Sequence, residues 1–190
     1  NILPHNEDID EFKEYIKEIR PLGFDAVLIA DLGMFSIMQE CAPEIPIHIS
    51  TQANNINYQS ACMWHKLGAK RVVLAREMSF DEIKEIRERT PEDLELEAFV
   101  HGAMCVSYSG RCLLSNYMTQ RDANQGACSH PCRWNYSLVE ETRPGEFMDV
   151  YENERGTFIF NSKDLCMIRY IPELVKSGIS SFKIEGRDKK

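Results

Sequence analysis

The sequence lacks the short motifs that mark several common enzyme and ligand-binding classes. No G-x-G-x-x-G occurs, so the glycine-rich turn of dinucleotide-binding sheets is missing. Neither H-E-x-x-H nor G-x-S-x-G is present, which removes the zinc-protease helix and the serine nucleophile elbow. Close C-x2-C pairs, which are typical of zinc ribbons, are absent too. These absences count against a nucleotide-binding open sheet and against a hydrolase with a recognisable catalytic motif.

Long apolar runs are also missing. No stretch approaches the roughly 18 to 20 apolar residues that cross a bilayer, and the start of the chain lacks the basic and apolar zones of a signal peptide. We therefore expect a cytoplasmic protein without a membrane partner. Its seven cysteines are then reduced thiols or metal ligands, not disulfides. With 190 residues and 43% hydrophobic content, the chain can bury one sizeable core.

The net charge of −8 is unevenly distributed along the chain. Residues 1–100 carry 10 Lys and Arg against 19 Asp and Glu, whereas residues 101–190 carry 12 against 11. Between residues 101 and 139, Arg111, Arg121 and Arg133 face a single acid, Asp122. The second half therefore permits a local surface for an anion or a phosphate, although the whole chain is acidic.

Short apolar runs alternate with amphipathic helical patterns, which predicts parallel βα units. Six strands are expected, at residues 26–30, 45–49, 71–75, 94–100, 157–160 and 181–184. Helices are expected over residues 7–20, 33–41 and 56–67, from a capping box at Ser79 and Glu82, and in a segment broken near Pro172. Six strands are too few for a closed eight-stranded barrel. The prediction is an α/β fold, an incomplete TIM-type barrel that is a portion of a longer protein, with a doubly wound open sheet as the alternative.

The βα pattern is interrupted once. Residues 1–115 form the predicted partial barrel, and residues 157–190 continue it. The intervening residues 116–156 are predicted to form an insertion without a helix, which contains a hairpin of residues 136–141 and 147–151 around a turn at 143–145. An excursion of this length is a candidate lid or binding segment.

Polar residues stand where the predicted strands end. The carboxyl ends of parallel strands meet at one edge of the sheet, where such folds bind their ligands. The expected ring of polar side chains is Asp31, Ser50, Thr51, Gln52, Arg76, Glu77, His101, Asn161, Lys163, Glu185 and Arg187. Within it, the candidates for catalytic groups are His101, Lys163, Glu185 and Arg187. By charge and placement, the candidates for binding a carboxylate are Arg76, Lys163 and Arg187.

Five of the seven cysteines follow the fourth predicted strand: Cys105, Cys112, Cys128, Cys132 and Cys166. Soft thiolates in fours suit a structural zinc ion or an iron–sulfur cluster, and the missing C-x2-C pairs favour the cluster. A cysteine nucleophile is a further alternative, because His101 or His130 is available as the base that a thiolate needs. Cys41 and Cys62 fall in predicted helices and are expected to be ordinary buried thiols.

Four segments together resemble one protein family. They read EAFVHGAMCVSYSGRCLLS (97–115), GACSHPCRW (126–134), RGTFIFNSKDLC (155–166) and FKIEGR (182–187). The likeness covers essentially the whole chain, which is identified as a member of the collagenase-like peptidase family thirty-two of unknown catalytic type. Within this family the likeness is greatest to the bacterial prephenate-dependent tRNA uridine hydroxylases, which form 5-hydroxyuridine at the wobble position.

The resemblance implies an RNA-modifying oxidoreductase with a four-iron four-sulfur cluster. Its motif positions imply the ligands Cys105, Cys112, Cys128 and Cys166, with Cys132 as a possible substitute for Cys128. It further implies tRNA as partner and prephenate as the small-molecule hydroxyl donor. Zinc stays the alternative metal, and the older description as a collagenase-like peptidase stays the rival function.

Overall fold

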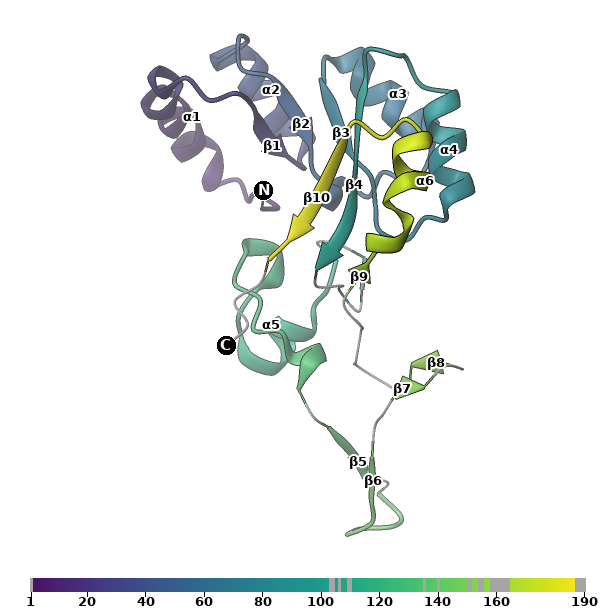
Figure 1. Cartoon of the computed structure of the whole chain (residues 1–190). Helices are drawn as coiled ribbons and strands as arrows, with labels where there is room; N and C mark the ends of the chain where they lie inside the picture. Colours follow the sequence, from purple (N-terminus) through teal and green to yellow (C-terminus); the bar gives the residue numbers. More distant parts are fainter. Residues whose placement is uncertain are drawn as a thin grey trace.

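The computed structural model describes residues 2–102, 105, 107–108, 111–134, 136–139, 141–149, 152–153, 156–157 and 165–186. Its main feature is a curled, largely parallel sheet in the order β1-β2-β3-β4-β10, with β9 paired antiparallel to β4 (Figure 1). The strands are β1 (Val27–Ile29), β2 (Ile47–Ile49), β3 (Arg71–Val73), β4 (Glu95–Gly102), β9 (Leu165–Cys166) and β10 (Ser181–Glu185). The predicted α/β half-barrel is therefore confirmed.

Helices connect the strands and pack against the sheet. Figure 1 shows α3, α4 and α6 together beside β3 and β4, whereas α1 and α2 lie beside β1 and β2. The α-helices are α1 (Asp8–Ile19), α2 (Leu32–Cys41), α3 (Tyr58–Leu67), α4 (Phe80–Glu88), α5 (Leu114–Thr119) and α6 (Ile171–Lys176). The 3-10 helices are η1 (Arg20–Leu22), η2 (Thr51–Ala53), η3 (Ala123–Gln125), η4 (Pro131–Arg133) and η5 (Ile168–Tyr170). Among the described residues, no helix is long and apolar enough to cross a membrane.

The two faces of the sheet differ in chemistry because side chains alternate along each strand. On β4, Leu96, Ala98 and Val100 are buried in the apolar core that the helices cover. Between them, Glu97 and Phe99 belong to the opposite face, which also carries charged residues of β3 and β10. The face of the sheet that the helices do not cover therefore carries charged side chains.

The capping box predicted at Ser79 is present at the start of α4. The Ser79 hydroxyl accepts a hydrogen bond from the Glu82 N–H at 3.4 Å, and the Glu82 carboxylate accepts one from the Ser79 N–H at 2.7 Å. We expect Ser79→Ala to lower the free energy of unfolding by about 1 kcal/mol, because the first turn of α4 loses its side-chain acceptor. Chemical denaturation measures this, with Ser60→Ala as the control in a hydroxyl that caps no helix. An unchanged unfolding midpoint for Ser79→Ala would contradict the role of the cap.

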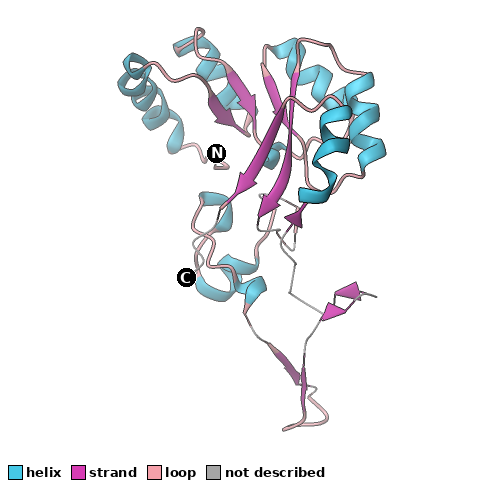
Figure 2. Ribbon diagram, viewed as in Figure 1, coloured by secondary structure: helices cyan, strands magenta, loops and turns pink. Residues whose placement is uncertain are grey.

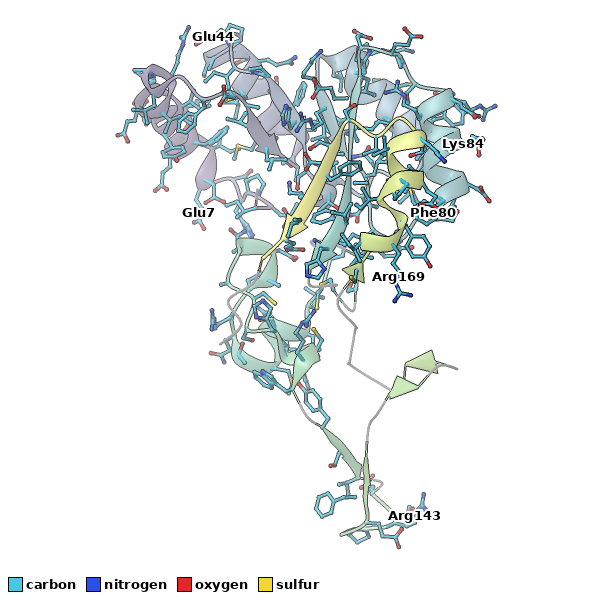
Figure 3. All side chains as sticks on the ribbon, viewed as in Figure 1. Glu7, Glu44, Phe80, Lys84, Arg143 and Arg169 are labelled. Carbon is cyan, nitrogen blue, oxygen red and sulfur yellow. The ribbon has the colours of Figure 1, made fainter. Side chains whose placement is uncertain are left out.

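The segment after β4 corrects one prediction and confirms another. The insertion was expected to contain no helix, but α5 ends only at Thr119, and η3 and η4 follow it. The predicted hairpin is confirmed: β5 (Ser137–Val139) pairs antiparallel with β6 (Phe147–Asp149). Figure 2 shows a lobe of short helices beyond the ends of β4 and β10, with this hairpin extending away from it. Arg143 lies near the tip of the hairpin (Figure 3).

Two expectations concern the last part of the barrel. Residues 158–160 of the predicted strand 157–160 lie outside the described residues, and Thr157 belongs to β8 (Gly156–Thr157), which pairs with β7 (Glu152–Asn153). On the side of β4 away from β3, the parallel neighbour is β10, and the register aligns Gly102 with Glu185. The helical segment is divided near Pro172, as expected: η5 ends at Tyr170, and Pro172 sits in the first turn of α6, where its missing N–H leaves no hydrogen bond unmade.

Candidate functional site

A cavity of about 300 Å3 lies at the carboxyl ends of the strands. Its walls come from the turn after β2, the loop after β3, the ends of β4 and β10, and the lobe that follows β4. The lining residues are Ser50, Thr51, Gln52, Arg76, Phe99, Cys105, Cys112, Ala123, Asn124, Cys128, Lys183, Ile184, Glu185 and Gly186. Strand-end polar residues and three cysteines thus surround one space.

Arg76 and Glu185 form an ion pair on one wall of this cavity. The Arg76 side chain is 5% exposed, and its guanidinium carbon lies 4.0 Å from the centre of the Phe99 ring, an arrangement in which the ring attracts the cation. Because Arg76 follows β3 and Glu185 ends β10, the pair spans the intervening strand β4. The ring and the carboxylate hold the guanidinium at the cavity wall.

Glu97 is the centre of the charged network beneath the cavity. Its carboxylate accepts hydrogen bonds from the Ser181 hydroxyl at 2.7 Å and the Arg71 guanidinium at 3.0 Å, and the Lys183 ammonium lies 3.1 Å away. Burial alone would raise the pKa of Glu97, but the hydrogen bonds from Ser181 and Lys183 and the charges of Lys183 and Arg71 outweigh burial and hold the pKa below its ordinary value. Glu97 thereby fixes Lys183, which lines the cavity.

The lowered pKa of Glu97 predicts a pH-dependent contribution to stability. A carboxyl group whose pKa is lower in the folded state stabilises the fold above its unfolded pKa of about 4.3, and this stabilisation is lost as the pH falls through the folded pKa. We expect Glu97→Gln to lower the free energy of unfolding by about 2 kcal/mol at pH 7, and the difference from wild type to shrink below pH 4. Unfolding curves at pH 7 and pH 3.5 measure it.

Glu95→Gln is the matched control for this pH effect. Glu95 accepts a hydrogen bond from Arg71 at 2.8 Å, but its side chain is more exposed than that of Glu97. The variant should therefore cost less stability at pH 7. A Glu97→Gln variant that loses the same free energy at both pH values would show that the carboxylate charge does not stabilise the network.

Cys105, Cys112 and Cys128 all line the cavity as partly buried free thiols. Hydroxyl groups fix the segment that carries Cys128. The buried Ser115 hydroxyl, in α5, accepts a hydrogen bond from the Ser129 N–H at 3.0 Å, and the Thr119 hydroxyl lies 2.9 Å from that of Ser129. Because α5 begins two residues after Cys112, these bonds hold the two thiol-bearing segments together.

His130 adopts a left-handed conformation with φ of 56°, which costs a non-glycine residue free energy. Its backbone N–H donates a hydrogen bond to the Cys128 sulfur at 3.4 Å. Such N–H donors stabilise a thiolate and tune a bound metal. Backbone strain beside Cys128 therefore coincides with a contact that orients its sulfur.

The other two cysteines of the group occupy different surroundings. Cys132 is 7% exposed, belongs to η4 and does not line the cavity. Cys166 is exposed in β9, where the register places it opposite His101 of β4. Within the described residues, no three His, Cys, Asp or Glu side chains are grouped closely enough to hold a metal ion. A metal at this site requires the thiols to approach one another.

The eleven members of the predicted ring divide into three groups. Ser50, Thr51, Gln52, Arg76 and Glu185 line the cavity together. Asp31 instead caps α2 through a hydrogen bond from the Met34 N–H at 3.0 Å, while Glu77 and His101 are exposed and do not line the cavity. Asn161, Lys163 and Arg187 lie outside the described residues, so their candidate roles stay predictions.

The sequence did not single out several lining residues, among them Phe99, Asn124 and Lys183. Lys183 and Phe99 lie inside strands, and only the placement of polar or aromatic residues on alternate positions of an otherwise apolar strand signals them. Asn124 belongs to η3, which the N-terminal segment anchors: the Leu3 N–H donates to the Asn124 carbonyl at 3.1 Å. No local pattern predicts that contact between distant segments.

An α/β half-barrel with a polar, thiol-lined cavity at its strand ends has its site where barrel enzymes have theirs. Residues 1–190 match the family described as Peptidase family U32. The chain belongs to this family, as the four sequence segments predicted.

Curated relatives carry names that refer to RNA. The tRNA hydroxylation protein P of Escherichia coli K12 is 41% identical over the whole chain, and the tRNA hydroxylation protein P1 of Bacillus subtilis 168 is 42% identical. The 23S rRNA 5-hydroxycytidine C2501 synthase of Escherichia coli K12 is 34% identical over the whole chain, which covers 27% of that protein. The chain covers 50% and 44% of the first two proteins, so it spans about half the length of these curated relatives.

A solved structure titled as a U32 peptidase shares the fold. It has a TM-score of 0.53 with this chain at 14% sequence identity, and the match covers 97% of this chain and 64% of that one. At this identity the likeness concerns the fold alone. It agrees with the half-barrel architecture described above.

Proposed function

We propose that this chain forms the base-modifying part of an RNA hydroxylase that converts the wobble uridine of tRNA to 5-hydroxyuridine. The observation that carries the proposal is the shared cavity, where three cysteines meet the polar strand ends of a chain 41% identical to a tRNA hydroxylation protein. Names of relatives that refer to tRNA and to an rRNA hydroxycytidine support a pyrimidine in RNA as the substrate. Hydroxylation replaces the C5 hydrogen by a hydroxyl group, so a donor supplies the oxygen and is itself reduced by two electrons.

The thiol side chains at the site are the type of ligand that holds an iron–sulfur cluster in a protein. Cys105, Cys112 and Cys128 would hold it from the cavity walls, and Cys166 would complete the set from the end of β9. When bound, such a cluster supplies redox chemistry or a Lewis-acidic iron for the hydroxyl donor. The hydrogen bond from the His130 N–H to the Cys128 sulfur would orient one ligand.

A small anionic donor such as prephenate would find its counter-charges in the same cavity. Arg76 and Lys183 both line the cavity, and each is already held by a carboxylate, Glu185 and Glu97 respectively. Guanidinium and ammonium groups bind carboxylates through charge-assisted hydrogen bonds. These ion pairs keep both cations in position, because they restrict the rotation of the Arg76 and Lys183 side chains.

The lobe after β4 is the proposed contact for the RNA backbone. Arg111 and Arg121 are exposed there, and Asp122 is the only acid between residues 101 and 139 of the sequence. Asp122 is also engaged in the fold, because it caps η3 through the Asn124 N–H at 2.8 Å. Arginines beside a cavity neutralise phosphates, whereas the acidic residues concentrate in the first hundred residues.

Nucleoside mass spectrometry of bulk tRNA tests the proposal. A strain deleted for the gene should lose 5-hydroxyuridine and nucleosides derived from it, and expression from the complete gene should restore them. Unchanged levels of these nucleosides in the deletion strain would contradict hydroxylation of tRNA by this protein.

Peptidase activity is the rival function, which the family description and a 42% identical relative named as an uncharacterized protease favour. Its discriminator is the digestion of denatured collagen by wild type and by Cys105→Ala. A cysteine peptidase using this cavity would lose activity in the variant. Equal digestion by both proteins would point to another nucleophile or to a contaminating protease.

A further inference from the structure

Several carboxamide atoms in or near the cavity wall are buried and lack a hydrogen-bond partner. Among the described residues, five carboxamide atoms from four residues are buried and unpaired: Gln52 Oε1, Asn54 Oδ1, Asn55 Oδ1, Asn55 Nδ2 and Asn124 Oδ1. Buried polar atoms are nearly always hydrogen-bonded in folded proteins, and each unpaired one costs about 1 to 3 kcal/mol. Unpaired atoms of this kind beside a cavity leave hydrogen-bonding capacity that a ligand or an ordered water can complete.

The position of these groups connects them to the cavity. Gln52 and Asn124 line it from two different segments, the turn after β2 and the helix η3. Asn55 is 1% exposed, and its carbonyl accepts a hydrogen bond from the N–H of Ala75, the neighbour of the lining residue Arg76. Gln52 and Asn124 therefore belong to the cavity wall, and Asn55 to the layer behind it.

Hydrogen bonds fix the backbones of Gln52 and Asn124, the two residues that line the cavity. The Gln52 N–H donates to the Ser50 hydroxyl at 3.2 Å, and the Asn54 side chain donates to the Gln52 carbonyl at 3.2 Å. The Asn124 N–H donates to Asp122, and its carbonyl accepts from Leu3. By contrast, the nearby Asn57 uses its side-chain oxygen to cap α3, at 2.9 Å from the Ser60 N–H.

We propose that the carboxamides of Gln52 and Asn124 bind the hydrogen-bonding edge of a pyrimidine base of RNA. A carboxamide presents one acceptor oxygen next to N–H donors, which matches the adjacent N3–H and O4 of uracil. Rotation of the amide by 180° exchanges donor and acceptor and matches N3 and the amino group of cytosine. The carboxamides carry no charge, so they offer an anionic donor no counter-charge.

This assignment divides the cavity by chemistry. Among the lining residues, the cations Arg76 and Lys183 are suited to an anion, the three cysteines to a metal or cluster, and the carboxamides of Gln52 and Asn124 to a neutral, planar group with both donors and acceptors. The edge that pairs in a duplex is accessible only on a base that has left its stack, so the substrate base must be unpaired or flipped out. The inference rests on the proposed function for the identity of the polymer, RNA.

Ligand-observed NMR with uridine 5′-monophosphate tests the inference on the protein expressed from its complete gene, and requires neither cluster nor donor. We expect Gln52→Leu and Asn124→Leu each to weaken binding roughly 3- to 10-fold, the effect of losing one hydrogen bond. The matched control is Gln59→Leu, at an exposed position of α3, which should bind as wild type does. The 3-methylated nucleotide should bind wild type more weakly, and Gln52→Leu should add little further loss.

Thermal unfolding of the same variants separates ligand binding from a structural role. Replacing an unpaired buried amide by an apolar group of similar size leaves stability unchanged or raises it. Binding that equals wild type in both leucine variants, no detectable binding of the nucleotide at millimolar concentration, or unfolding midpoints that fall together with affinity would overturn the inference. Amide-dependent binding without any change in tRNA nucleosides would instead contradict the proposed function and leave the base site standing.

Discussion

Cys128→Ala is expected to reduce the iron bound by the anaerobically purified protein by at least about tenfold and to remove its broad visible absorption, whereas Cys132→Ala should retain both. The two residues are four positions apart, and spacing alone does not separate them. Their surroundings do: Cys128 lines the cavity with Cys105 and Cys112, while Cys132 is buried in η4. Alanine supplies no ligand, so only the residue that holds metal should matter.

Metal analysis and visible spectra of the two variants decide this prediction, with thermal unfolding as the check that both remain folded. Stoichiometric zinc in a colourless wild-type protein would contradict the iron–sulfur cluster, but it would agree with a metal site formed by the thiols. Loss of iron in Cys132→Ala with full retention in Cys128→Ala would contradict the assignment of the cavity thiols as ligands.

Gly102→Ala is expected to destabilise the fold by about 2 to 5 kcal/mol. Gly102 ends β4 with φ of 123°, a conformation that side-chain-bearing residues rarely adopt. A Cβ there would collide with the backbone carbonyl of Glu185, its partner in the register of β4 and β10. The two strand ends would have to separate, and the ion pair between Glu185 and Arg76 on the cavity wall would be displaced with them.

Gly23→Ala is the matched control for Gly102→Ala. Gly23 also has a positive φ, of 68°, but apart from Gly23 and its two chain neighbours, no atom of the described residues lies within 4 Å of the position a Cβ would take. It should therefore show only the conformational cost of about 1 to 2 kcal/mol. Chemical denaturation of both variants gives the difference. Equal losses would mean that the close approach of β4 and β10 carries no additional cost.

The sequence predicted the scaffold because each element had a local signal. Apolar runs and flanking caps located β1 to β4 and β10, and the spacing of Ser79 and Glu82 predicted the capping box found on α4. The convergence of Gln52, Arg76 and Glu185 followed from one rule, that parallel strands end at the same edge. The topology of the sheet therefore predicted that these residues lie close together, although they are far apart in the sequence.

The details of the cavity were less predictable because they depend on packing between distant segments. Asp31 satisfied the same strand-end rule but became a helix cap, since its side chain meets the Met34 N–H. Asn124 entered the wall through its backbone contact with Leu3, which no periodicity reveals. The choice between Cys128 and Cys132 depends on burial, and the sequence reports spacing only.

The nucleosides of tRNA provide the most direct measurement of the claim that the strand-end cavity hydroxylates RNA. Deletion strains expressing wild type, Cys105→Ala and Cys62→Ala from the complete gene should be compared by mass spectrometry. Cys105 lines the cavity, whereas Cys62 lies in α3, where its thiol contacts the Arg89 carbonyl at 3.4 Å. We predict full 5-hydroxyuridine with wild type and Cys62→Ala, and none with Cys105→Ala. Wild-type levels of 5-hydroxyuridine in the Cys105→Ala strain would contradict the account.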